Sequence, residues 1–111
     1  MNTIAERTLN LRTSDGDVEV PIRIYAPEFS GVAWICRYET DWPEGRQTMV
    51  AHGFDSVQAL VIAMQMIAAD IYTSSYHEAG QLHFRPDWKG YGFPVTHNIR
   101  DMLIGEDAKY L

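Results

Sequence analysis

The stretch from Val57 to Tyr72 reads VQALVIAMQMIAADIY and decides the fold. Thirteen of its sixteen residues are apolar, and Ala, Leu and Met are strong helix formers. The apolar residues recur at spacings of three and four, which puts one set on a single stripe of a helix with about 3.6 residues per turn. That stripe comprises Val57, Leu60, Met64, Ile67 and Ile71. The pattern predicts one long central helix with this stripe facing the core.

The helix has a well-marked start and is too short to span a membrane. Asp55 is placed to accept hydrogen bonds from the first backbone N–H groups, and Gln58 three residues later completes a capping box. The central helix is therefore predicted over residues 55–74. A bilayer span needs about 20 apolar residues, whereas this run is shorter and carries Asp70 in its last turn. We expect no membrane anchor.

Residues 1–52 are predicted to form antiparallel strands, because apolar and polar residues alternate there as in strands with one buried face. The alternating segments are residues 8–12, 18–24, 32–40 and 47–52. Asp15-Gly16 is typical of a tight hairpin between the first two strands. The Pro and Gly of residues 41–45 predict the turn between the last two. The inward set of the second strand is Val18, Val20, Ile22 and Ile24.

The chain after the central helix is predicted to add a short strand and an aromatic loop over residues 81–95, followed by a last helix. Thr96 is placed to cap a short helix over residues 97–104 that ends near Gly105. Its apolar stripe would be Ile99, Met102 and Leu103. The expected fold is α+β: an antiparallel sheet of four to five strands, arranged as a β-meander, packed against one long central helix, with a short C-terminal helix. We expect a single domain over residues 1–111.

Composition limits the classes of partner. The chain has 111 residues, 46% of them apolar, and a formal net charge of −6. A net negative charge without a basic block repels phosphate backbones, so we expect no nucleic acid and favour a basic protein partner.

Cys36 is the only cysteine, and residues 1–12 lack the basic start and apolar run of a secretory signal. A reducing, cytoplasmic location is therefore expected.

Four segments resemble a known family. They are Ile4–Arg7, Asp41–Pro43, the helix opening Asp55–Leu60, and Gly92–Val95 with its sequence Gly-Phe-Pro-Val. Together they resemble a family of short bacterial proteins catalogued only as a domain of unknown function, over roughly residues 4–95. The resemblance implies a single domain. It implies no activity, cofactor or catalytic residue, and the segment after Val95 falls outside the shared pattern.

The four histidines, His52, His77, His83 and His97, raise the question of a metal site, because neutral imidazole is a preferred zinc ligand. Their spacing does not match a metal motif, since no pair has the register of a helical His-x-x-x-His site. His77 and His83 are the weak metal candidates. We expect no metal and no cofactor.

Two other patterns allow catalysis without requiring it. Cys36 alternates with Trp34 and Tyr38 on one strand face, where a free cysteine is either a small core residue or part of a pocket wall. These three residues are the candidate lining of a ligand pocket. Two carboxylate pairs, Glu39 with Asp41 and Glu106 with Asp107, are each either a general acid and base or solvated turn and tail residues. We assign no catalytic residue.

The second side of the central helix is also apolar, where a surface helix would carry charged residues. This side comprises Ala59, Ile62, Ala63 and Met66. Either the chain's own C-terminal part covers it or a second copy does, in a twofold homodimer. Trp and Tyr side chains suit both cores and binding surfaces. The partner-surface candidates are Ile62, Met66, Trp42 and Trp88.

The sequence therefore favours an acidic, non-catalytic protein-interaction module, comparable to inhibitor or immunity proteins that neutralise a basic partner. The alternative is a small-molecule binding protein, or an enzyme acting on a small molecule, with a pocket between helix and sheet.

Overall fold

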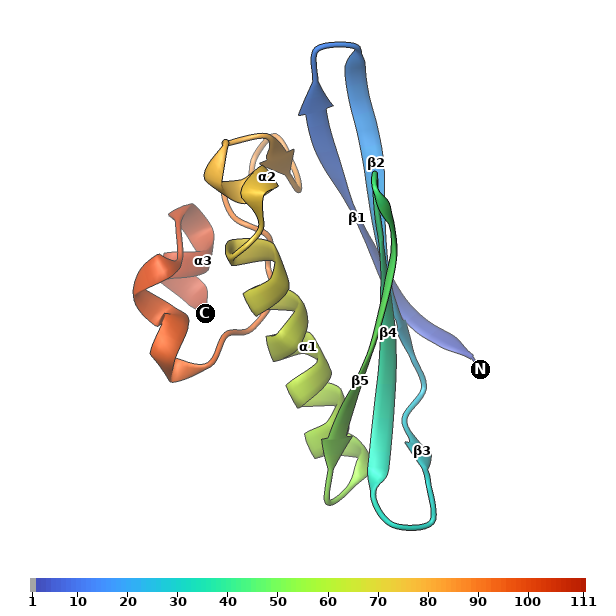
Figure 1. Ribbon diagram of the computed structural model, residues 1–111. Helices are drawn as coiled ribbons and strands as arrows, with labels where there is room; N and C mark the ends of the chain where they lie inside the picture. Colours follow the sequence, from blue (N-terminus) through green and yellow to red (C-terminus); the bar gives the residue numbers. More distant parts are fainter. Residues whose placement is uncertain (1) are drawn as a thin grey trace. The chain divides into compact units, whose positions relative to one another are not determined.

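The computed structural model describes residues 2–111 (Figure 1). The chain forms two compact units. Unit 1 contains the residues up to Thr8 together with Val20–Ala63, and unit 2 contains Leu9–Glu19 together with Met64–Leu111. No helix among the described residues is long and apolar enough to cross a membrane.

The fold is α+β, as predicted, with six antiparallel strands and four helical segments among the described residues. The strands are β1 (Thr3–Thr13), β2 (Gly16–Tyr25), β3 (Glu28–Phe29), β4 (Trp34–Trp42), β5 (Gly45–Gly53) and β6 (Leu82–His83). The helices are α1 (Ser56–Tyr72), α2 (Ser75–Glu78), the 3-10 helix η1 (His97–Met102) and α3 (Gly105–Tyr110). The strand order is β3-β4-β2-β1-β6, and β5 pairs with β4. The prediction of four to five strands missed the two-residue strand β3.

The additional strand, β3, forms because the chain stops pairing with β4 at the end of β2 and pairs with β4 again a few residues later. β2 pairs with β4 through Ile24 opposite Tyr38, and β3 pairs through Phe29 opposite Trp34. Between them, the Ala26 N–H donates to the Asn2 carbonyl at 2.7 Å instead of to β4. Pro27 has no N–H to donate. The edge along β4 is therefore divided between two strands.

The hairpin β4–β5 is the longest regular pairing described in unit 1. It runs from Trp34 opposite Gly53 to Trp42 opposite Gly45, so only two residues form the turn predicted over residues 41–45. The side chains of one face of the unit 1 sheet are buried with two alanines of α1. This core comprises Val20, Ile22, Ile24, Cys36, Tyr38, Thr40, Ala51, Ala59 and Ala63.

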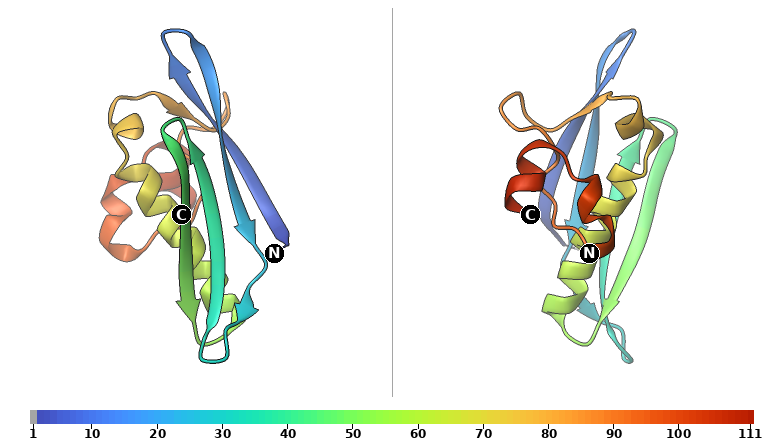
Figure 2. Two further views of the ribbon diagram at one scale, coloured as in Figure 1. Left: turned by 45° about the vertical axis from the view of Figure 1, so that its right-hand side comes forward. Right: turned by 90° about the vertical axis from the view of Figure 1, so that its left-hand side faces the viewer.

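The predicted core stripe of α1 is wrong in the first half of the helix. Val57 is exposed, whereas Ala59 and Ala63 are fully buried. The N-terminal half of α1 runs beside β4 and β5 (Figure 1, Figure 2). A Cβ atom on Gly53 would lie 2.5 Å from the Ala59 backbone nitrogen, so helix and strand approach closely and small side chains fill the contact.

The predicted cap of α1 is present, with one difference. The Gln58 N–H donates to Asp55 Oδ1 at 2.8 Å. In a standard capping box the Gln58 side chain would accept from the N–H of the cap residue, Asp55. Here its Oε1 accepts from the N–H of the preceding residue, Phe54, at 2.6 Å. Both bonds satisfy backbone donors and fix the path of the chain into the helix.

Unit 2 joins the β1–β2 hairpin to the C-terminal part of the chain. β6 pairs with β1 through Leu82 opposite Leu11, and the Arg12 N–H donates to the Gln81 carbonyl at 2.8 Å. Val18 of β2 is exposed, so the prediction that it faces inward is wrong. The apolar core of unit 2 comprises Leu9, Leu11, Ile67, Ala68, Ile71, Tyr72, Leu82, Tyr91, Phe93 and Leu103.

A fully buried carboxylate, Asp107, anchors the C-terminus of unit 2. It accepts from Tyr72 OH at 2.5 Å, Trp88 Nε1 at 2.9 Å, Tyr91 N–H at 2.8 Å and Gly92 N–H at 2.9 Å. A Cβ atom on Gly90 would lie 2.4 Å from the Asp107 carboxyl carbon, and Gly90 has φ +112°. Only glycine suits that position.

The C-terminal helix predicted over residues 97–104 is wrong in type and extent. Residues 97–102 form the 3-10 helix, Leu103 and Ile104 are extended, and α3 begins at Gly105, where the prediction ended. Two hydrogen bonds of 3.0 Å fix this start: Glu106 N–H to the Lys89 carbonyl, and Lys89 N–H to Glu106 Oε2. These contacts join segments far apart in sequence, so local helix signals did not reveal them.

Replacing Asp107 with Asn should destabilise the chain. Asn keeps one acceptor oxygen but turns an NH₂ group, itself a donor, toward the four donors around it. We expect Asp107→Asn to lower the free energy of unfolding by about 3 kcal/mol, as when a buried charged network is broken. Urea denaturation followed by Trp fluorescence measures this, with the exposed Asp101→Asn as the control. Equal stability of the two variants would contradict the anchoring role.

Candidate functional site

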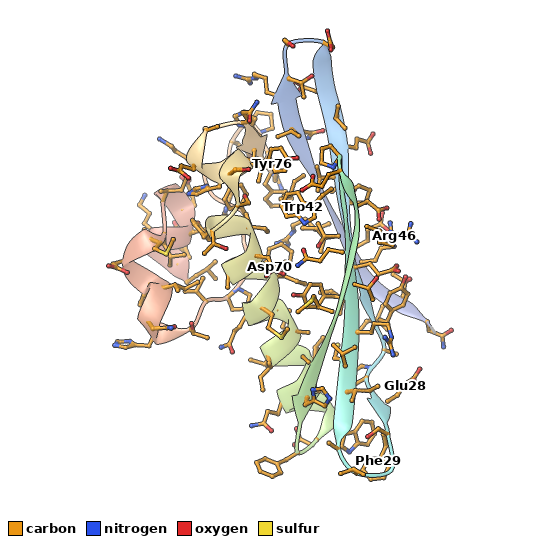
Figure 3. All side chains as sticks on the ribbon, in the orientation of Figure 1. Glu28, Phe29, Trp42, Arg46, Asp70 and Tyr76 are labelled. Atoms are coloured by element: carbon orange, nitrogen blue, oxygen red, sulfur yellow. The ribbon has the colours of Figure 1, made fainter. Side chains whose placement is uncertain are left out.

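Large apolar side chains are exposed at the end of unit 1 where β3 turns into β4 and β5 turns into α1. The exposed fractions are 94% for Phe54, 93% for Val32, 67% for Val57 and 59% for Phe29. Figure 3 labels Phe29 and its neighbour Glu28 at this end. A groove of about 390 Å³ lies among these residues. It is lined by Phe29, Val32, Ala33, His52, Gly53, Phe54, Gln58 and Ile62.

The groove is built on hydrogen-bonded backbone. Ser30 closes the β3–β4 loop, because its Oγ accepts from the Ala33 N–H at 3.1 Å and donates to the Ala33 carbonyl at 2.8 Å. The Phe29 ring lies against the Trp34 ring, with centroids 5.9 Å apart. Phe54 is held through its N–H by Gln58. The backbone segments that carry the exposed rings are therefore held by hydrogen bonds.

The segments that supply the groove carry two acidic residues and no basic one. Residues 27–33 and 52–62 contain Glu28 and Asp55 and no Lys or Arg. Asp55 is exposed at the start of α1, whereas Glu28 lines a separate hollow with Ile35 and Arg37 and points away from α1 (Figure 3). His52 is the titratable residue of the lining, and no nucleophilic side chain lies beside it in that lining.

The sequence allows Glu39 and Asp41 as a general acid and base. They lie in a network of charges on the face of the unit 1 sheet opposite the buried one. Asp41 is 2.7 Å from both Arg23 and Arg46, and Glu39 is 3.5 Å and 3.7 Å from them. Arg46 points away from α1 (Figure 3). Tyr25 OH also donates to Glu39.

These contacts fix the ionisation of the network. The hydrogen bond from Tyr25 holds the pKa of Glu39 below its usual value, assisted by the charge of Arg46. Hydrogen bonds from Arg46 and Arg23 lower the pKa of Asp41. Both side chains are therefore carboxylates at neutral pH, and neither is available as a general acid.

The three predicted pocket residues lie on β4 and are not part of the groove lining, although Trp34 contacts Phe29 of that lining. Cys36 and Tyr38 are fully buried, and Trp34 is partly covered by Phe29. Burial raises the pKa of the Cys36 thiol, whose Sγ lies 3.4 Å from the Tyr25 carbonyl oxygen. A protonated, buried thiol is a core residue and a poor nucleophile. A ligand pocket around these three residues stays a prediction.

One of the four partner-surface candidates, Ile62, lines the groove. Met66 is half-buried on α1, Trp42 Nε1 donates to Gln47 Oε1 at 2.9 Å, and Trp88 belongs to the Asp107 anchor in unit 2. Sequence reasoning missed Phe29, Val32 and Phe54. Their signal was available: each is a large apolar residue in a segment whose turn composition places it at the surface.

The weak metal candidates are brought together in unit 2. His77 and His83 line one pocket, which is separate from the lining of the groove. The described residues contain no group of three or more His, Cys, Asp or Glu arranged to hold a metal ion.

Comparison with known proteins gives one match. A family model described as a domain of unknown function (DUF6968) matches residues 5–95. Searches of the curated proteins and of the solved structures found no significant match.

The charge network predicts a loss of stability in acid. Because the folded pKa of Asp41 lies below its unfolded value of about 3.8, its stabilisation is complete above that value and lost as pH falls through the folded pKa. At pH 7, Asp41→Asn should lower the free energy of unfolding by about 1 kcal/mol. The difference from the unmodified chain should shrink between about pH 4 and 2. Urea titrations at each pH test this.

The exposed hairpin variant Asp17→Asn is the matched control, and we expect it to change stability by less than about 0.5 kcal/mol at pH 7. A gap for Asp41→Asn that stays constant down to pH 2 would show that its carboxylate charge does not stabilise the fold.

Proposed function

Because this chain belongs to the family described as a domain of unknown function (DUF6968), which supplies no activity to start from, we propose its function from the groove of unit 1. We propose that it is an acidic, non-catalytic protein-interaction module. Its partner is a protein segment in which a large apolar side chain lies between Lys or Arg residues. The observation that carries this proposal is the exposed apolar groove, whose lining contains no Lys or Arg and which lies beside Asp55 at the start of α1.

The exposure of the groove residues supports a binding role. Monomeric soluble proteins expose isolated apolar side chains freely, but contiguous patches of them mark interaction sites. Here Phe29, Val32 and Phe54 are more than half exposed and line one groove. Removing such side chains from water stabilises a complex by about 25 cal/mol for each Å² of apolar surface buried.

The fixed backbone of the groove supports specific binding. A loop that must be ordered on binding reduces affinity, whereas a preorganised surface avoids that loss. Ser30 and Gln58 hold the two segments that carry Phe29 and Phe54. A large apolar side chain from a partner would therefore find an aromatic wall already in place.

Charge favours a basic partner over a second copy. In a twofold homodimer the same patch meets itself, so Asp55 of one copy would approach the same residue of the other. Each copy also carries a net charge of −6. A partner with Lys or Arg around its apolar anchor would gain from the same charges and associate faster at low salt. Inhibitor and immunity proteins that neutralise basic partners work by this principle.

A peptide selection tests the groove directly. A display library of random short peptides is selected on the immobilised full chain, and we expect a consensus with Phe, Trp or Leu flanked by Lys or Arg. Affinity of a selected peptide should fall at least about tenfold in Phe54→Ser, as for an aromatic hot spot. Val18→Ser, an exposed apolar position on β2 that is absent from the groove lining, is the matched control and should bind normally.

Four results would overturn the proposal. They are an empty selection, a consensus without basic residues, an affinity insensitive to salt, and equal binding by the Phe54→Ser variant. Sedimentation velocity supplies an independent check. A dimer of the full chain that dissociates on Phe54→Ser substitution would assign the groove to a second copy and overturn the basic partner.

A further inference from the structure

Unit 2 contains a pocket of about 360 Å³ that the proposed protein interaction does not use. Its volume is in the range of small-molecule sites, which start at about 300 Å³. Apolar surface comes from Leu82, Pro86 and Ile104, and the lining also includes Trp88 and Tyr91. Nitrogen-bearing side chains are contributed by His77, His83 and Lys89.

His83, one of the lining residues, carries an unused polar atom. Its Nε2 is buried and has no hydrogen-bond partner among residues 2–111. Buried polar atoms in folded proteins are nearly always paired, because an unpaired one loses its hydrogen bonds to water without replacement. A group from outside the described residues would satisfy this atom, and a ligand in the pocket beside His83 could supply it.

The second imidazole of the lining is held in place by two aromatic rings. His77 lies edge-on to Tyr72 and Tyr91, with ring centroids 4.8 Å and 5.4 Å away. Its Nδ1 is 2.6 Å from Tyr91 OH. Burial raises the pKa of Tyr91 to about 12 and lowers the pKa of His77, so the phenol keeps its proton and the imidazole is neutral at pH 7. With Tyr91 as the donor, His77 carries its proton on Nε2 and is a donor in turn.

The charge of the lining is positive, although the chain as a whole is acidic. Lys89 is the charged residue of the lining, and no Asp or Glu belongs to it. Three carboxylates belong to residues next to positions 88–90 of the lining, and each has partners of its own. Asp87, between Pro86 and Trp88, pairs with Arg85 at 2.9 Å. Glu106 accepts from the Lys89 backbone N–H, and the Asp107 carboxylate is occupied by its four donors. The lining therefore offers one fixed positive charge, two imidazoles and an apolar wall.

We propose that this pocket binds a small monocarboxylate with an apolar body. The carboxylate is recognised by His83 and Lys89, and the body lies against Trp88 and Ile104. A carboxylate matches the single positive charge of the lining, whereas a phosphate dianion would need more cationic groups. Pairing with the ligand also satisfies the buried Nε2 of His83, in its protonated form or as the N–H tautomer.

The experiment is a titration of the ¹⁵N-labelled full chain with phenylacetate, followed by ¹H–¹⁵N spectra. Phenylacetamide, the neutral analogue of the same shape, and inorganic phosphate are titrated in parallel. We expect saturable shifts in residues 77–91 with phenylacetate and at least about tenfold weaker binding of the other two. Each binding group is then tested by substitution. Lys89→Gln and His83→Gln should each weaken phenylacetate binding at least about threefold, as expected for one hydrogen bond to a charged group.

The matched controls are Lys109→Gln and His97→Gln, two exposed residues outside the lining, and both should bind normally. The absence of saturable shifts, equal binding of the amide, tighter binding of phosphate, or shifts confined to the groove of unit 1 would each overturn the proposal. If His83→Gln fails to fold, judged by its spectrum, Lys89→Gln decides alone, because that residue is exposed and unaltered affinity there would overturn the role of its charge.

Discussion

The carboxylate of Asp107 is a full negative charge with no exposure to water, and the order of the C-terminal part of unit 2 depends on how that charge is satisfied. An unpaired buried charge would be strongly destabilising. Four donors from Tyr72, Trp88, Tyr91 and Gly92 surround it instead. Because these donors come from α1 and from the aromatic loop, the carboxylate on α3 joins three parts of unit 2.

The same contacts shape the pocket beside them. Trp88 and Tyr91 are donors to Asp107 through an indole N–H and a backbone N–H, and both also line the pocket. The Tyr91 OH lies 2.6 Å from His77 Nδ1. A structural anchor and a candidate ligand site thus share side chains, so the geometry of the pocket is set by a network that the fold already requires.

In unit 1 the deciding constraint is the close approach of α1 to β5. Gly53 and Ala59 meet with no space for a Cβ atom between them, so the buried side of the first helical turns carries alanines. The larger Val57, three residues after Phe54, is exposed, as Phe54 is. Tight packing of small residues inside therefore accompanies the large apolar surface outside, and that surface is the basis of the proposed interaction.

Local signals in the sequence determined the α+β class, the position of the central helix, the Asp55–Gln58 cap and four of the strands, because each depends on neighbours within a few residues. Only the tertiary structure decided that Ala59 rather than Val57 is buried, that α3 begins where a helix was expected to end, and that His77 and His83 share a pocket. Periodicity identifies apolar faces, but it cannot measure the distance to the strand opposite, nor find the partners that a carboxylate at position 107 meets far away in sequence. Those features depend on contacts between distant segments, which exist only once the chain has folded.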